Sequence, residues 1–225
     1  MKAFFRFTLA AAVLFSGTWC FGQTVQPTPV RTPDKANARP APTPAAEPFD
    51  KADVKTMASN CVRLVTAAGD IDIELYPESA PETVRNFLNL AATGAFDTTT
   101  FSRIVPGFVI QGGNIWTRDS GVTSELGRRA RRTVPDEPNR IAHERGVVSL
   151  ARTDEPNTAT THFFILIDKS PTLDGKFAAF GRVTKGMETV DAINKMPVDG
   201  EKPVNPVRIS KATIFVCSSD APKSD

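Results

Sequence analysis

Short apolar segments separated by glycine turns run along the chain from residue 60 onward, and they restrict the folds that it can adopt. Residues 71–75 read Ile-Asp-Ile-Glu-Leu directly after a Gly-Asp turn. Because strand side chains alternate between two faces, this pattern predicts a β-hairpin with one solvated face. Further strands are predicted from similar runs at residues 101–110, 146–151, 163–167, 180–183 and 207–216.

Two helices are predicted among these strands. Pro81 and Glu82 suit a first helical turn, because Pro lacks an N–H that would stay unpaired and an acid complements the helix dipole. Apolar residues then recur at helical spacing up to Gly94, and a shorter helix is predicted over residues 187–193. Residues 114–145 are polar and predict a long loop. The pattern indicates a mainly β domain, a barrel or a sandwich, capped by helices.

The first 22 residues predict a secretory signal peptide. Lys2 and Arg6 give a positive start, and the apolar run that follows, residues 7–15, is too short to span a bilayer comfortably. We place cleavage after Gly22 and expect a periplasmic or secreted protein without stable membrane insertion after processing. The alternative is an uncleaved membrane anchor.

A segment rich in Pro and Ala follows at residues 23–52. It can bury little apolar area, so we expect a disordered linker that either holds the domain away from a surface or is an inert leader. The folded domain is expected over residues 53–219, with a flexible tail at 220–225.

Signal-peptide removal would leave two cysteines, Cys61 and Cys217, which bracket the domain. An oxidising compartment permits a disulfide between them, and the alternative is two small buried thiols. Only His143 and His162 could join them in a metal site, and the spacing is not that of a ligand set, so we expect no metal and no cofactor. We expect His143 to be structural rather than catalytic.

Composition narrows the classes of function. The chain has fifteen Phe beside two Trp and one Tyr, and because Phe has no polar group its rings are expected in a core or an apolar pocket. The net charge of +2 gives no reason to expect a nucleic-acid partner. A hydrolase is disfavoured, because no Gly-x-Ser-x-Gly elbow, phosphate loop or paired-glycine dinucleotide turn is found.

Residues 101–114 combine apolar side chains with one Arg and one Gln, Arg103 and Gln111. A guanidinium on an apolar surface is costly unless it has a partner or a ligand. Arg103 is therefore either a site residue or a structural arginine paired with a carboxylate such as Glu74.

Three ordered motifs resemble the cyclophilin-type peptidyl-prolyl cis-trans isomerases. The first is similar to the family's Phe-x-Arg-x-Ile/Val-Pro-Gly-Phe-x-x-Gln-Gly-Gly segment. The order and spacing of the three motifs agree with the family pattern over about residues 60–217. The matching segments are 101–113, 146–151 with 163–165, and 173–176 with 180–183. The sequence Leu-Ala-Arg that ends at Arg152 looks more like the corresponding segment of bacterial members. Together with the predicted signal peptide, this suggests an exported bacterial subtype.

The resemblance implies a closed eight-stranded antiparallel β-barrel capped by two α-helices. It also implies catalysed rotation about X-Pro bonds in proline-containing polypeptides. We expect a monomer that assists the folding of exported proteins. The alternative is a catalytically weak chaperone or scaffold module that binds proline peptides. Arg103 would be the catalytic residue. The substrate would be bound by Phe108, Val109, Gln111, Ala151, Arg152, His162, Phe164, Leu173 and Phe177.

Several positions depart from the family pattern. His162 replaces Gln, and it either makes activity pH-dependent or serves only as another hydrogen-bond donor. Thr172 replaces the Trp of cyclosporin-sensitive members, so weak binding of that drug is expected. Val109 and Phe177 predict a smaller pocket floor and a more apolar rim. The basic run Arg128–Arg132 either steers anionic partners or is a solvated loop face.

Overall fold

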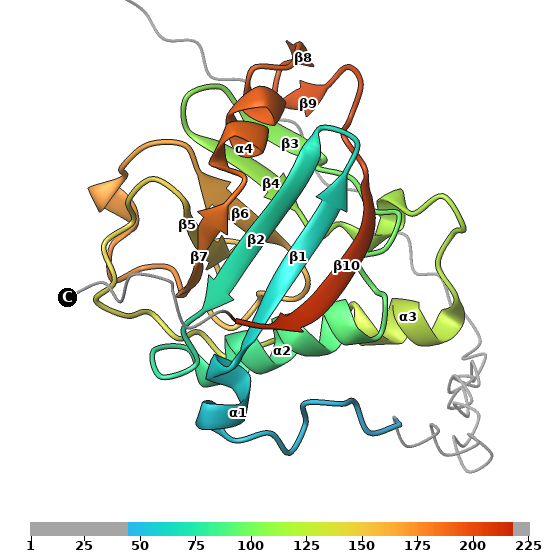
Figure 1. Ribbon diagram of the computed structural model, residues 1–225, viewed down its shortest axis with the longest axis vertical. Coiled ribbons are helices and arrows are strands. Elements are labelled where there is room, and N and C mark those ends of the chain that lie inside the picture. Colours follow the sequence, from blue (N-terminus) through green and yellow to red (C-terminus); the bar gives the residue numbers. More distant parts are fainter. Residues whose placement is uncertain (1–44, 218–225) are drawn as a thin grey trace, which may run out of the picture. The chain divides into compact units, whose positions relative to one another are not determined.

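One antiparallel sheet of eight strands dominates the computed structural model, which describes residues 45–217. The strand order is β10-β1-β2-β7-β5-β6-β4-β3 (Figure 1). The strands are β1 (Asn60–Thr66), β2 (Gly69–Leu75), β3 (Arg103–Val105), β4 (Val109–Gly112), β5 (Val147–Leu150), β6 (Phe163–Leu166), β7 (Ala179–Lys185) and β10 (Ile209–Val216). The predicted signal peptide, most of the predicted linker and the predicted tail lie outside the described residues.

The predicted first hairpin is confirmed: β1 and β2 pair with Thr66 opposite Gly69. Its polar face is less solvated than the sequence predicts. Asp72 is only 6% exposed. Arg63, directly opposite on β1, covers this carboxylate with two hydrogen bonds of 2.6 and 2.7 Å. The pair also raises the pKa of Arg63, chiefly through the hydrogen bond to Asp72.

The sheet curls until its two ends approach each other. The segment before β3 bonds to the segment at the start of β10, since Phe101 N donates to Val207 O at 2.9 Å and Ile209 N donates to Thr99 O at 2.8 Å. The continuous ladder nevertheless runs from β10 to β3 and stops there. The mainly β antiparallel fold is therefore confirmed, and complete closure of the barrel stays a prediction.

Both predicted helices are present, at opposite ends of the sheet (Figure 1). The longer one is α2 (Pro81–Ala92), with Pro in its first turn, and the shorter one is α4 (Met187–Asn194). The N-cap of α2, Ala80, has no capping side chain. The Glu137 carboxylate replaces it and accepts from the N–H groups of Glu82 and Thr83 at 3.0 and 2.8 Å.

Smaller elements were not predicted. They include α1 (Val54–Ala58), and within the predicted loop the 3-10 turn η2 (Ile115–Thr117) and α3 (Ser124–Arg129). The helix α3 begins where the Thr123 hydroxyl accepts from Leu126 N at 3.2 Å. Near α4 a short ribbon of β8 (Val198–Asp199) and β9 (Lys202–Pro203) extends beside β3, and η3 (Pro171–Leu173) precedes β7.

The core lies between α2 and the inner face of the curled sheet, and it is rich in Phe as the composition predicts. The ring of Phe87 on α2 meets Phe163 on β6 edge to face, with centroids 5.3 Å apart. Phe96 and Phe180 also contact Phe87, at 5.2 and 4.9 Å. These rings are at most 1% exposed, so they secure the fold and cannot meet a ligand.

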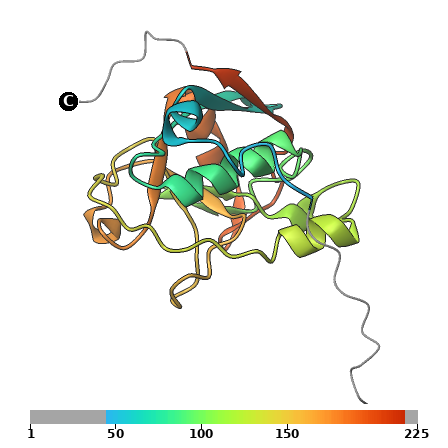
Figure 2. The ribbon, with the colours of Figure 1, turned by 90° about the horizontal axis from the view of Figure 1, so that it is seen from below.

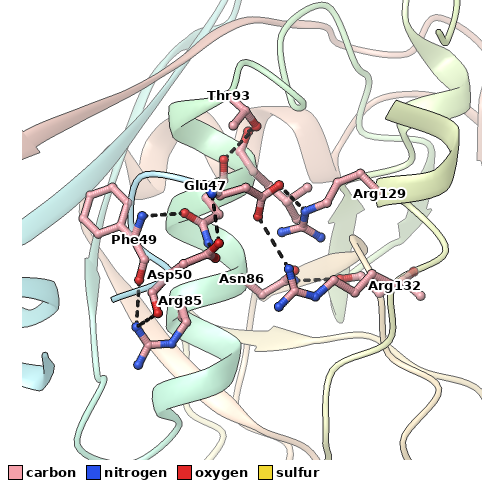
Figure 3. Close-up of polar contacts among 11 residues, drawn as sticks. Glu47, Phe49, Asp50, Arg85, Asn86, Thr93, Arg129 and Arg132 are labelled. Carbon is pink, nitrogen blue, oxygen red and sulfur yellow. Dashed lines mark hydrogen bonds and ion pairs between the residues drawn. The ribbon is translucent and has the colours of Figure 1, made fainter. Parts of the chain in front are cut away.

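The segment before α1 is ordered where a disordered linker up to residue 52 was expected. Figure 2 shows it passing along α2 toward α3. Phe49 N donates to Asn89 Oδ1 at 2.8 Å, and Arg85 Nη1 donates to Phe49 O at 2.7 Å. Glu47 pairs with Arg129 of α3 (Figure 3). Arg132 of the basic run also lies near this carboxylate, with 3.9 Å between Arg132 Nη1 and Glu47 Oε2, so two of the run's arginines have a structural partner that their charge alone did not indicate.

Cys61 and Cys217 are joined by a disulfide with an S–S distance of 2.09 Å. Cys61 lies on β1 and Cys217 directly follows β10, where its N–H donates to Ser59 O at 3.0 Å. The bond therefore ties the end of the described chain to the start of the sheet. Among residues 45–217, no helix is long and apolar enough to span a membrane, and no group of three or more His, Cys, Asp or Glu could hold a metal.

Candidate active site

A second apolar cluster lies on the outer face of β4, β5 and β6. Ile110 and Phe163 belong to the core, while the adjacent Val109 and Phe164 belong to this second cluster, because successive strand residues face opposite sides. We call it the outer cluster. Its buried members are Val109, Val147, Phe164, Leu166 and Ala179, and partly buried around them are Val105, Phe108, Ile141, Ala151, Leu173 and Phe177.

Most of the residues predicted to bind substrate are brought together here. Phe108, Val109, Ala151, Phe164, Leu173 and Phe177 are all in the outer cluster. Leu173 ends η3, and Phe177 N donates to Leu173 O at 3.3 Å, so one turn supplies both side chains. The ring of Phe177 meets Phe164 edge to face at 5.8 Å. Thr172, on the same turn, is exposed.

Arg103 lies on the same face as this cluster. Arg103 on β3 is directly opposite Gln111 on β4, and Gln111 is directly opposite Phe164 on β6. Residues directly opposite in an antiparallel sheet point to the same side. The guanidinium is thus outside the core, and its side chain is 40% exposed.

Hydrogen bonds continue along this row. Arg103 Nη1 donates to Gln111 Oε1 at 3.3 Å, and Gln111 Nε2 lies 3.4 Å from His162 Nδ1. The amide nitrogen can only donate, so Nδ1 must accept, which requires an unprotonated nitrogen there. Burial lowers the pKa of His162 below its usual 6.5, which favours this form at neutral pH. His162 therefore acts here as an acceptor, where the sequence suggested a donor.

The carboxylate partner of Arg103 is Glu201. Glu74 was the example given from the sequence for such a partner. Glu201 accepts from Arg103 Nε at 2.6 Å and from Nη2 at 3.1 Å. These hydrogen bonds lower the pKa of Glu201, with the positive charge of Arg103 adding to the effect. Glu74 instead accepts from the Tyr76 hydroxyl at 3.0 Å.

Arg152 reaches this face differently. Its guanidinium lies 5.1 Å from the centroid of the Phe177 ring, and it donates to the backbone oxygens of Asp154 and Lys176 at 3.2 Å each. The side chain therefore braces two loops against the ring. The backbone of Ala151 is also engaged, since its N–H donates to His162 O at 2.9 Å.

A hydrogen-bonded Ser-His-Asp set beneath the outer cluster was missed by the sequence analysis. His143 Nδ1 lies 3.0 Å from Asp174 Oδ1, and His143 Nε2 lies 2.9 Å from Ser149 Oγ. Such a set can form a nucleophile in hydrolases, but Ser149 is 0% exposed and His143 1%, so no substrate can reach them. Asp174 directly follows η3, and its pKa is lowered mainly by the hydrogen bond from His143 N. The set holds the Leu173 turn against β5.

Asn194, the last residue of α4, was also missed. Its side-chain oxygen accepts from Gly107 N at 2.8 Å, and its nitrogen donates to Val105 O and Val109 O at 2.9 and 3.1 Å. All three partners belong to the β3–β4 hairpin that carries Phe108. A buried amide at a helix end gives no recognisable signal in a sequence.

Comparisons with known proteins agree with this arrangement. The family model for cyclophilin type peptidyl-prolyl cis-trans isomerases matches residues 61–214. The peptidyl-prolyl cis-trans isomerase cypE of Dictyostelium discoideum is 36% identical over 157 residues, covering 70% of this chain and 99% of that protein. The peptidyl-prolyl cis-trans isomerase-like 3 protein of Gallus gallus is 40% identical, covering 68% and 94%.

Two further comparisons are informative. A protein of Brucella suis described as a probable peptidyl-prolyl cis-trans isomerase is 35% identical, covering 69% of this chain and 82% of its own length. A crystal structure of a Cryptosporidium parvum cyclophilin type isomerase, obtained in the presence of the dipeptide Ala-Pro, superposes with a TM-score of 0.60. It is 32% identical, covering 71% of this chain and 99% of that one. With this family match over residues 61–214 and the same fold, the chain belongs to the cyclophilin-type peptidyl-prolyl cis-trans isomerases.

Proposed function

We propose that this isomerase binds proline over the outer cluster and twists the X-Pro bond beside Arg103. The observation that carries the proposal is the cross-strand row of Arg103, Gln111 and Phe164, which places a cation, an amide and a ring side by side. The related Cryptosporidium parvum protein was crystallised in the presence of Ala-Pro, and this supports a proline peptide as ligand.

The physics of the reaction suits these groups. An amide resists rotation by about 18–20 kcal/mol because its nitrogen shares a lone pair with the carbonyl. No covalent bond changes, so the enzyme needs only to bind the twisted amide better than either planar form. As the bond twists, the lone pair returns to the proline nitrogen. An N–H of Arg103 can then donate to that nitrogen or to the proline carbonyl, and an apolar surrounding strengthens the bond.

The rings are expected to hold the substrate during this rotation. Phe164 is 7% exposed and Val109 2%, so together they form a firm floor. Phe108, Leu173 and Phe177 are half-buried around it and can contact a pyrrolidine ring. The amide of Gln111, whose oxygen is occupied by Arg103, can donate its second N–H to the substrate backbone.

The biological setting is also proposed. The predicted signal peptide supports export to the periplasm or the medium, where the enzyme would act as a monomer on exported proteins that fold slowly at X-Pro bonds. Cell fractionation and N-terminal sequencing of the mature protein test this. We expect Gln23 as the first mature residue, and recovery of the uncleaved chain from the cytoplasm would contradict it.

Activity is tested with the wild-type protein in a protease-coupled assay on an Ala-Pro peptide. The isomerase is expected to accelerate cis-to-trans conversion at catalytic concentrations and to speed the proline-limited refolding of a test protein. A catalytically weak chaperone or scaffold module would instead bind the peptide, and would change the refolding yield only at stoichiometric amounts.

A further inference from the structure

The guanidinium of Arg103 is held along one edge by the carboxylate of Glu201, which lies outside the three family motifs. The Glu201 carboxylate accepts hydrogen bonds from Arg103 Nε and Nη2 at 2.6 and 3.1 Å. Gln111 Oε1 accepts one from Arg103 Nη1 at 3.3 Å. A guanidinium has five N–H donors, so one N–H on each terminal nitrogen has no acceptor in this row.

Glu201 reaches Arg103 because its backbone is fixed beside β3. It lies in the turn between β8 and β9, after Gly200, whose φ of 61° lies in the left-handed region that glycine adopts easily. Ile104 N, next to Arg103, donates to Glu201 O at 2.8 Å. The backbone of the turn is thus anchored independently of the ion pair, and the side chain is presented to Arg103 from a rigid support.

This ion pair contributes little to the stability of the fold. The two side chains are 40% and 55% exposed, and pairs in contact with water are typically worth about 0–1 kcal/mol. What a bidentate pair does provide is direction, since the two parallel bonds fix the plane of the guanidinium. A free arginine side chain would have to lose much of its rotational freedom each time it bound the transition state.

We propose that Glu201 is a positioning residue for the isomerase reaction: it orients Arg103 so that the free N–H groups face the twisting amide. The inference rests on the proposed role of Arg103. It assigns catalytic importance to a turn 98 residues away in the sequence, between two two-residue strands.

The test compares Glu201→Ala with Asp199→Ala, which removes the same charge from the same hairpin but leaves Arg103 untouched. We expect Glu201→Ala to lower kcat about tenfold with little change in KM, because orientation matters most in the transition state. Glu201→Gln keeps one acceptor and should retain an intermediate kcat. Asp199→Ala should match the wild type, and all three variants should melt within a few degrees of it.

A double variant shows whether the effect passes through Arg103. In an Arg103→Lys background the planar guanidinium that Glu201 binds with two hydrogen bonds is absent. Adding Glu201→Ala there should therefore lower kcat less than twofold. A full additive loss there, an unchanged kcat in the single variant, or an increased kcat would each overturn the inference while leaving the isomerase function intact. A wild-type protein without isomerase activity would overturn the proposed function, and this inference with it.

Discussion

Phe163 and Phe164 are neighbours on β6, yet their surroundings differ completely. Phe163 is 0% exposed and meets Phe87, Phe96 and Phe101 edge to face at 5.3, 5.5 and 6.3 Å. Among residues 45–217, Phe164 has one aromatic partner, Phe177 at 5.8 Å, and it stays 7% exposed. The inner ring is enclosed by other rings, whereas the outer ring leaves an edge that another molecule can meet.

The two faces of the sheet also differ in their polar side chains. On the outer face, Arg103, Gln111 and His162 form a chain of hydrogen bonds beside the rings. On the inner face, Ile104, Ile110 and Ile165 of the same strands belong to the apolar core cluster. One sheet therefore separates the residues that stabilise the fold from those that we propose to face a substrate, and substitutions on the two faces should have different consequences.

The largest expected difference is between the two phenylalanines. Phe163→Ala should lower the free energy of unfolding by about 3–5 kcal/mol, because a fully enclosed ring leaves a cavity. Phe164→Ala should cost less stability, since its site can be filled by water or by Phe177, but it should lower kcat/KM more than any folded inner-face variant. Denaturant unfolding and the protease-coupled assay measure the two effects. A reversed order of stability losses would contradict the comparison.

Loss of the disulfide should affect stability alone. The bond closes a separation of 156 residues, and removing a native disulfide typically costs about 2–5 kcal/mol. The joined strands β1 and β10 are not neighbours of β3, β4 or β6 in the sheet, so kcat/KM of the folded protein should stay at the wild-type value. The double variant Cys61→Ser/Cys217→Ser tests this. A loss of kcat/KM in protein that is still folded would show coupling between the disulfide and the outer face.

The buried network under the outer cluster should affect both properties moderately. His143→Leu leaves the Ser149 hydroxyl without its partner in a fully buried site, which costs about 1–3 kcal/mol. It also removes the ring's contact with Asp174, which leaves only the backbone N–H of residue 143 to hold that carboxylate, so the Leu173 turn should loosen and KM should rise. Adding Ser149→Ala removes the unpaired hydroxyl and should restore part of the stability but not KM. Equal stability of the single and double variants would contradict this account.

The smallest effect should be a pH dependence carried by His162. Burial lowers its pKa, so the folded protein binds this proton less readily than the unfolded chain does. Stability should therefore be complete above about pH 6.5, the unperturbed pKa, and decline as the pH falls below it, whereas activity should decline only as the pH falls through the lower pKa of the folded protein. Protonation removes the acceptor for Gln111, worth about 0.5–1.5 kcal/mol. His162→Gln should show a flatter pH–rate profile between pH 5 and 8, and identical profiles would refute the idea.

The elements that depend on local sequence could be predicted. Alternation and turn residues indicated the first hairpin, and helical spacing after Pro81 indicated α2. Residues 101–113 place Arg103 and Gln111 eight positions apart on one hairpin, so their pairing follows from the Pro-Gly turn between them. The family resemblance added Phe164 of β6, Leu173 of η3 and Phe177, which follows η3.

The contacts that could not be predicted join distant segments. Glu201 and Asn194 approach β3 and the hairpin from positions that only the folded sheet brings near. His143 and Ser149 are six residues apart, but neither lies in a recognisable hydrolase motif. The ordered start of the domain was missed for a related reason, because Glu47 gains its partner only once α3 has formed.

The proposed active site depends most directly on Arg103, so kcat/KM for an Ala-Pro peptide should be measured for Arg103→Ala beside the wild type. Loss of a preorganised donor of this kind typically costs about 2–4 kcal/mol of transition-state stabilisation, or roughly 30- to 1,000-fold in rate. We predict a loss in that range, with peptide affinity within a few fold of the wild type and an unchanged melting temperature. Near wild-type turnover by a folded Arg103→Ala protein would contradict the assignment of the outer face as the active site.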